Sequence, residues 1–92
     1  MTNDAIYRKT YISTATTTQV FTGPGTLHSI VVNTTAAGAI AVIDGIAGST
    51  ANVASLKASI VEGTYLYDCA LANGLRIVTA GASDITVTWT QG

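Results

Sequence analysis

The stretch that decides the fold reads Asp84-Ile85-Thr86-Val87-Thr88-Trp89-Thr90. Apolar and hydroxyl side chains alternate along it, and a period of two residues places the two sets on opposite faces of a β-strand. We expect Ile85, Val87 and Trp89 to line the core and the threonines to face outward. A buried Trp89 would need a hydrogen-bond acceptor for its indole N–H.

Most of the chain consists of similar short segments that are rich in β-forming residues and are separated by turn residues. The expected β-rich runs are 11–21, 26–34, 39–43, 52–60, 64–70, 75–80 and 84–90. Gly23-Pro24-Gly25 predicts a loop, and Asp44-Gly45 predicts a tight turn. Asn73-Gly74 is typical of a hairpin that joins the runs on either side of it. The run 52–60 also fits helical spacing, but its β-rich surroundings favour a strand.

About seven short strands with frequent turns predict an all-β fold, a compact antiparallel β-sandwich that is either jelly-roll-like or a small barrel. A single flat sheet would leave one apolar face in water. The 92 residues suffice for one domain, which we place at residues 11–92. Residues 1–10 have no strand periodicity and predict a short N-terminal arm.

Composition favours a structural or binding role over catalysis. Sixteen of the 92 residues are threonine, whereas the chain has one His, one Cys and nine charged side chains. Threonine is β-branched and suits a pleated surface, while nucleophiles, bases and metal ligands come mainly from residue types that are scarce here. We therefore expect a protein that is not an enzyme and that uses no cofactor.

The low charge also limits the partners. Charged residues make up 10% of the chain, the net charge is −1 and the mean hydropathy is +0.43, so electrostatic repulsion gives little protection against association. This favours a homo-oligomer or an assembly-bound protein. Four basic residues are too few for a nucleic-acid footprint, and the apolar stretches are too short to span a bilayer. We expect neither nucleic acid nor a membrane as a partner.

The single cysteine, Cys69, excludes an intrachain disulfide. We expect a buried, inert thiol, which suits synthesis in a reducing cytoplasm. The residues from Met1 to Asp4 are polar and acidic, and such a start does not predict a signal peptide.

Three aspartates, Asp44, Asp68 and Asp84, lie near turns or in a strand. Their spacing matches no EF-hand loop, and acid-base catalysis would need one carboxyl group in an apolar pocket. We interpret them as turn caps and solvated side chains. The sequence thus offers no catalytic carboxylate pair.

His28 is the only histidine, and Cys69 is a distant soft ligand, so a zinc site lacks its ligands. Ser29 or Ser59, together with His28 and an aspartate, would supply the residue types of a Ser-His-Asp catalytic triad. The sequence contains no nucleophile-elbow motif, however, so it does not predict such a triad. We expect His28 to be a surface or interface residue. No catalytic, cofactor-binding or metal-binding residue is predicted.

Aromatic side chains leave one other kind of binding open. Tyr7, Tyr11, Tyr65, Tyr67 and Trp89 could stack on sugar rings, as in a small carbohydrate-binding β-sandwich module. The alternation around Trp89 argues against this, because it points that ring inward. Sugar binding remains an alternative function.

Several stretches carry a family resemblance. They read Thr26-Leu27-His28-Ser29-Ile30-Val31-Val32-Asn33-Thr34 with the later Asp44-Gly45, then Tyr65-Leu66-Tyr67-Asp68, Asn73-Gly74-Leu75-Arg76-Ile77-Val78-Thr79 and Asp84-Ile85-Thr86-Val87-Thr88-Trp89. Together they resemble small virion structural proteins of tailed bacteriophages over roughly residues 20–90. Within that family, a capsid decoration (cement) protein fits the chain best.

The resemblance implies a protein that sits on the outside of the capsid, where coat subunits meet, and stabilises the shell. Such proteins are small, β-rich and often trimeric. It therefore implies the major capsid protein as a partner, a homotrimer as the favoured oligomer, a place on the capsid surface of the virion and no catalytic residues. A low-copy neck or tail subunit would have the same composition and remains an alternative.

We expect the arm to carry the interface with a coat or sister subunit. Strand periodicity is lost before Tyr11, and two of the four basic residues, Arg8 and Lys9, lie in the arm. The predicted interface residues are Tyr7, Arg8, Lys9 and Tyr11. An arm of this kind would become ordered when it binds.

Overall fold

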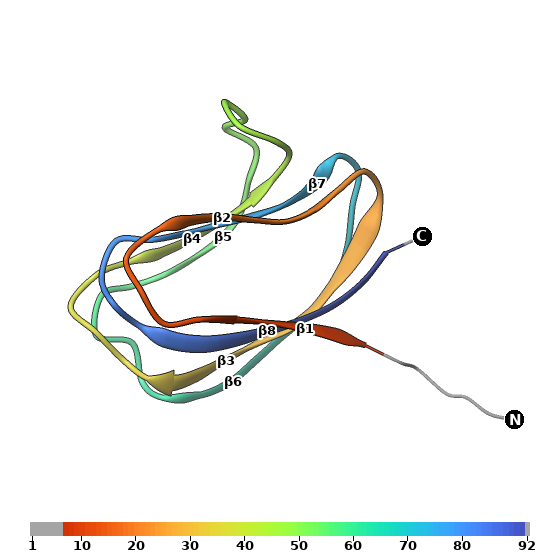
Figure 1. Cartoon of the computed structure of the whole chain (residues 1–92). Helices are drawn as coiled ribbons and strands as arrows, with labels where there is room; N and C mark the ends of the chain where they lie inside the picture. The colour runs from red at the N-terminus through yellow and green to blue at the C-terminus, as the bar shows by residue number, and fades with distance from the viewer. Residues whose placement is uncertain (1–6, 92) are drawn as a thin grey trace, which may run out of the picture.

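Two stacked antiparallel sheets of four strands each form the protein in the computed structural model, which describes residues 7–91 (Figure 1). The strands are β1 (Arg8–Ile12), β2 (Thr17–Thr22), β3 (Gly25–Thr34), β4 (Ile40–Asp44), β5 (Asn52–Leu56), β6 (Gly63–Leu71), β7 (Gly74–Thr79) and β8 (Asp84–Gln91). Sheet A has the order β1-β8-β3-β6, and sheet B has the order β2-β7-β4-β5. The predicted all-β sandwich is confirmed.

The strand order is that of an eight-stranded jelly roll. The first strand pairs with the last, β2 pairs with β7, β3 with β6 and β4 with β5. The chain thus follows one long antiparallel ribbon that is rolled up, so that successive strand pairs lie alternately in sheet A and sheet B. The described residues contain eight strands rather than about seven, because the predicted run 11–21 is interrupted and its two ends enter different sheets.

The predicted arm is wrong in its extent. Pairing with β8 begins at Arg8, which lies opposite Trp89, and continues to Ile12, opposite Ile85. An edge strand is held by backbone hydrogen bonds along one side, so it does not need a regular apolar alternation. Residues 8–10 therefore belong to the folded domain. Of the rest of the predicted arm, Tyr7 directly precedes β1, and residues 1–6 lie outside the described residues.

Two further expectations about local structure are corrected. Asn73-Gly74 does make a tight connection, but β6 lies in sheet A and β7 in sheet B, so the turn crosses between sheets and closes no hairpin. The predicted strand over 52–60 ends at Leu56. Beyond it Ser59 adopts a left-handed φ of 56° and donates its backbone N–H to the Ala36 carbonyl at 2.9 Å. Segment 46–50 lies outside the strands.

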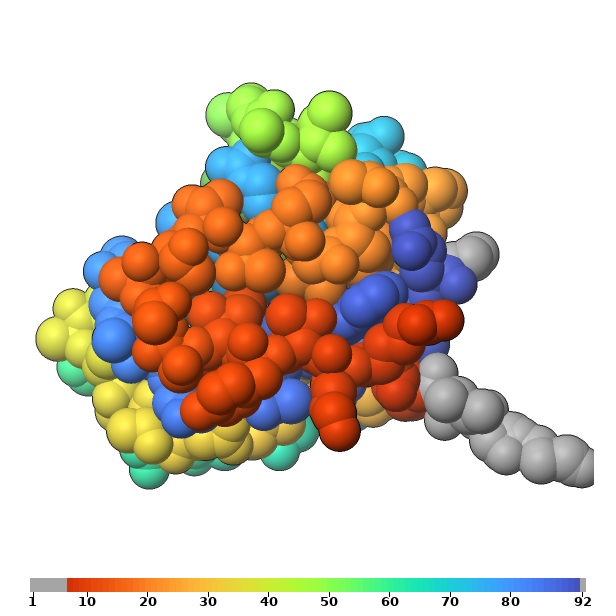
Figure 2. Space-filling view, viewed as in Figure 1, coloured from red at the N-terminus to blue at the C-terminus, as the bar shows by residue number. Residues whose placement is uncertain are grey.

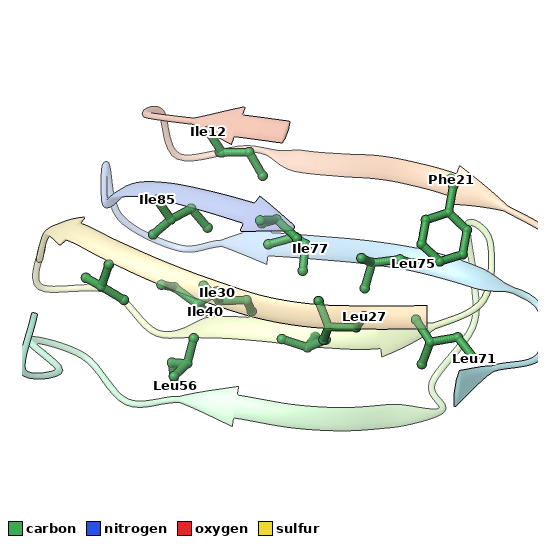
Figure 3. Close-up of a cluster of buried hydrophobic side chains, with 13 residues drawn as sticks. Ile12, Phe21, Leu27, Ile30, Ile40, Leu56, Leu71, Leu75, Ile77 and Ile85 are labelled. Carbon is green, nitrogen blue, oxygen red and sulfur yellow. The ribbon is translucent and has the colours of Figure 1, made fainter. Parts of the chain in front are cut away.

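The core lies between the two sheets and draws residues from all eight strands (Figure 3). Its buried members are Ile12, Phe21, Leu27, Ile30, Val32, Ile40, Val42, Leu56, Leu71, Leu75, Ile77, Ile85 and Val87. Ile85 and Val87 have no exposed surface, as the alternation predicts. Trp89 also points inward, but it is only partly buried. Its ring packs 5.0 Å from that of Phe21, and its indole N–H donates to Thr10 Oγ1 at 3.0 Å.

One buried hydroxyl joins the connection between β1 and β2 to the end of β7. Thr79 Oγ1 accepts the Thr16 backbone N–H at 3.0 Å and donates to the Thr14 carbonyl at 2.7 Å, and the residue is 3% exposed. Replacing Thr79 with valine keeps the shape but leaves these backbone groups without their partner. We expect Thr79→Val to lower the free energy of unfolding by about 1–3 kcal/mol, measured by urea denaturation. Thr64→Val on an exposed position of β6 is the control and should change stability by less than about 0.5 kcal/mol.

Candidate functional site

The four predicted interface residues lie along one open edge of the sandwich. Tyr7 precedes β1, and Arg8, Lys9 and Tyr11 belong to it, at the edge of sheet A. Figure 2 shows this strand in red on the visible face, next to the blue β8. All four are exposed, and Tyr11 has 61% of its surface in solvent. The structure thus gathers these residues on an accessible edge, and their contact with a partner stays a prediction.

Neighbouring strands hold the side chains of this edge in place. The Tyr11 hydroxyl donates to Asp84 Oδ2 at 2.5 Å, and this hydrogen bond raises the pKa of Tyr11 because it stabilises the protonated phenol. Asp84 also accepts from the Asn33 amide at 3.1 Å. The Arg8 guanidinium lies 6.0 Å from the centre of the Trp89 ring, within reach of a cation-π contact. Asp84 is therefore an acceptor that orients Tyr11 on the outer face of sheet A.

A second cluster, missed by sequence reasoning, joins Tyr7, His28 and Asp68. His28 Nδ1 lies 2.5 Å from Asp68 Oδ1, and the Tyr7 ring stacks on the imidazole with centroids 3.9 Å apart and planes 5° apart. The side chains of His28 and Asp68 are 26% and 53% exposed. The prediction of a surface histidine holds, but its partner lies forty residues along the chain, too far for a local pattern to identify.

Backbone irregularities create this cluster. The register of β3 shifts between Leu27 and Ser29 against both β6 and β8, so His28 lies at a bulge. Opposite it, Asp68 has a left-handed φ of 47°, a conformation that non-glycine residues adopt rarely. Bulges redirect side chains, and here the two strands turn a histidine and an aspartate toward each other.

The structure brings together two members of the triad considered from the sequence, but not the third. The Ser29 hydroxyl lies 2.6 Å from Thr88 Oγ1 and is almost fully buried. Within residues 7–91, no hydrogen bond joins a hydroxyl to His28, and no group of three His, Cys, Asp or Glu side chains could hold a metal ion. Among residues 7–91, the cluster has the geometry of a hydrogen-bonded His–Asp pair at the surface, covered by an aromatic ring.

Asp44 is a turn cap, as the sequence predicts. Its carboxylate accepts the backbone N–H groups of Ala72 at 3.0 Å and Asn73 at 2.9 Å, which ties the end of β4 to the connection between β6 and β7. The hydrogen bond from Ala72 makes the largest contribution to lowering the pKa of Asp44, followed by that from Asn73. These hydrogen bonds favour the charged carboxylate.

This lowered pKa predicts a pH-dependent effect of Asp44→Asn. A carboxylate with a depressed folded-state pKa stabilises the fold above its unfolded pKa of about 3.9, and that contribution is lost as the pH falls through the folded-state value. We expect the wild type to have the higher urea midpoint at pH 7 and the difference to shrink as the pH is lowered below about 4. A difference that stays constant between pH 7 and pH 2.5 would contradict this account of Asp44.

Cys69 and the two tyrosines beside it lie on the inner side of β6. All three are partly buried and pack against the core. Cys69 is therefore less buried than expected, although desolvation raises its pKa and so disfavours the reactive thiolate. Desolvation likewise raises the pKa of Tyr67, and the Tyr65 hydroxyl donates to the Val61 carbonyl.

Three large apolar side chains stand in solvent and were not singled out from the sequence. Leu66 on β6 is 64% exposed, Val61 before β6 is 74% exposed, and Ile46 after β4 is 57% exposed. Leu66 could have been identified, because it alternates with Tyr65 and Tyr67 and must face away from them. Val61 and Ile46 lie in connections, where no periodicity reports the direction of a side chain.

The surface formed by residues 7–91 has no pocket, and this part of the chain contains no helix that could span a membrane. The fold and the exposed residues define a small jelly-roll protein with open edge strands and apolar side chains at its surface. No protein-family model, curated protein or solved structure matches the chain.

Proposed function

We propose that this chain is a non-enzymatic structural protein of a tailed-bacteriophage virion, and that it binds the outside of the capsid as a decoration protein. The observation that carries the proposal is the jelly-roll strand order, an architecture that recurs in viral capsid proteins and also in lectin domains. It supports the resemblance of the sequence to small phage virion proteins. A fold alone assigns no function, so the surface must also fit.

The surface fits a protein that works in an assembly. Tyr11, Ile46, Val61 and Leu66 expose large apolar side chains on a domain with few charges. Contacts with the major capsid protein and with sister copies, a trimer being the favoured oligomer, would remove part of this surface from water. An oligomer that touches several coat subunits at once gains effective concentration, so that modest single contacts hold the shell together.

The alternatives fit the structure less well or differ in copy number. A neck or tail subunit would need the same kind of surface but would occur in few copies per particle. For a carbohydrate-binding module, three of the five candidate aromatics are engaged: Tyr65, Tyr67 and Trp89 pack against the core. Tyr7 and Tyr11 remain exposed, but Tyr7 is stacked on His28.

Addition of the purified chain to capsids that lack it tests the proposal. We expect saturable binding at a fixed number of copies per capsid, measured by co-sedimentation, and release of the capsid contents at a higher temperature after binding. A chain that remains in the supernatant at saturating concentration would contradict a decoration role.

Deletion of only the first part of the predicted arm, residues 2–6, tests whether that part contributes to capsid binding. Because β1 begins at Arg8, deletion of residues 2–6 leaves both Tyr7 and the strand in place. We expect this variant to remain folded and to occupy fewer sites on the capsid. Undiminished occupancy would show that residues 2–6 make no contact with the shell.

A further inference from the structure

We propose that copies of this chain join head to tail, with β1 of one copy pairing antiparallel to β6 of the next and extending sheet A across the contact. This inference deepens the self-association that is part of the proposed function, because it names the surfaces involved. The test of this inference uses the purified chain without virions. A failure of edge pairing can therefore be distinguished from a failure of the proposed decoration role.

The two edges of sheet A have complementary directions. Among the described residues, β1 pairs only with β8, and β6 pairs only with β3. The outer N–H and C=O groups of such edge strands can pair with another chain. Because four strands alternate in direction, β1 and β6 run opposite ways. A second copy with its strands in the same direction therefore presents its β1 antiparallel to β6, and a rotation about an axis along the strands would close three such copies into a ring.

The two edges also carry opposite charges. Arg8 and Lys9 are exposed on β1, while Asp68 on β6 and Glu62 just before it are exposed at the other edge. Pairing β1 with β6 brings unlike charges together, whereas pairing two β6 edges would gather acidic side chains. Opposite charges across a strand pair stabilise it, and like charges destabilise it. The charges thus favour the head-to-tail arrangement over a symmetric pairing of β6 with itself.

Apolar side chains match in the same arrangement. Tyr11 on β1 and Leu66 on β6 are 61% and 64% exposed. An antiparallel register that sets Tyr11 opposite Leu66 also brings Lys9 near Asp68, which is exposed and contacts His28. Regular pairing is interrupted at that point, because the register of β6 shifts between Leu66 and Cys69 and Asp68 lies within the shift. The apolar pair therefore sets the register, and the opposite charges of Lys9 and Asp68 add to it across the bulge.

Disulfide trapping tests the pairing directly. Tyr11→Cys and Leu66→Cys are made as separate variants in a Cys69→Ser background, mixed in equal amounts and oxidised. Within one sheet A, β1 and β6 are three strand spacings apart, about 14 Å, whereas a disulfide needs Cα atoms within about 7 Å. Any disulfide between positions 11 and 66 is therefore formed between copies.

Intact mass spectrometry measures the amounts of the mixed dimer and of the two homodimers. We expect the mixed dimer of Tyr11→Cys with Leu66→Cys to make up a larger fraction of all dimers than random pairing of the two variants would give. Homodimers in excess would show a symmetric contact and overturn the proposal. The absence of disulfide-linked dimer would overturn the proposal as well. This result is also expected if these edges bind a coat protein and not a second copy of the chain.

A matched pair of charge insertions supplies the second test. Leu66→Lys places a positive charge in the middle of the proposed contact, where it meets the basic edge of Arg8 and Lys9, and Ile46→Lys places the same charge on a similarly exposed side chain outside both edges. We expect Leu66→Lys to weaken self-association at least about tenfold in sedimentation velocity and Ile46→Lys to leave it unchanged. Circular dichroism checks that both variants fold. Equal effects of the two variants, or no effect of Leu66→Lys, would contradict edge pairing.

Discussion

Replacing Leu27 with alanine is expected to lower the free energy of unfolding by about 2–5 kcal/mol. Leu27 lies on β3 with no surface exposed, and its side chain belongs to the core between the sheets. The substitution removes buried apolar surface and leaves a cavity that strands held in two sheets can close only in part. Small domains have a total stability of about 5–15 kcal/mol, so this single change is a large fraction of it.

The same substitution on the outside of the sheet is the control. Leu66 is 64% exposed on β6, and Leu66→Ala in dilute protein should change stability by less than about 0.5 kcal/mol. Urea denaturation followed by tryptophan fluorescence measures both variants, since Trp89 packs against the core. Similar losses at the two positions would contradict the placement of Leu27 between the sheets.

Replacing Gly38 with alanine is the second change expected to have a large effect, about 3 kcal/mol of destabilisation, at the upper end for an overpacked site. A Cβ atom at Gly38 would lie 2.2 Å from the Gly81 backbone nitrogen and 2.6 Å from the Ala80 carbonyl carbon. These are backbone atoms, so no side chain can rotate away. The β3–β4 and β7–β8 connections would have to separate, which would strain the hydrogen bond from the Ala80 N–H to the Ala39 carbonyl.

Gly48 provides a contrasting position. Its φ of +93° strains any alanine, but a Cβ atom there would meet nothing within 4 Å. We expect Gly48→Ala to cost about 1–2 kcal/mol, less than Gly38→Ala. Thermal unfolding of the two variants compares them, and an equal or smaller loss at Gly38 would contradict the close approach of the two connections.

The sequence predicts the fold best in a strand that turns one face toward the core and the other toward solvent. β8 is such a strand: Ile85 and Val87 are fully buried, whereas Thr86 and Thr88, which alternate with them, are only partly buried. A period of two residues reports this arrangement directly. Trp89 follows the same period but is only partly buried, because it lies opposite Arg8 at the start of the edge strand β1. The alternation identifies the direction of a side chain, and not how deeply it is covered.

Features that depend on distant partners could not be predicted from local sequence. The tight turn at Asn73-Gly74 has hairpin chemistry, yet only the tertiary structure decides whether the next strand stays in the same sheet. β1 is held by backbone pairing, which leaves no side-chain pattern. The pair of His28 and Asp68 depends on bulges in two strands. The interface residues predicted from the sequence were chosen for the charge and the aromatics of one segment, whereas the exposed Leu66 on the opposite edge of sheet A was not chosen.

The copy number of this chain in purified virions, relative to the major coat protein, tests the central claim most directly. Quantitative mass spectrometry of intact particles gives this ratio. A decoration protein that occupies positions across the whole shell is expected at a ratio near that of the coat protein. A ratio far below that, or absence from the particles, would contradict a decoration role.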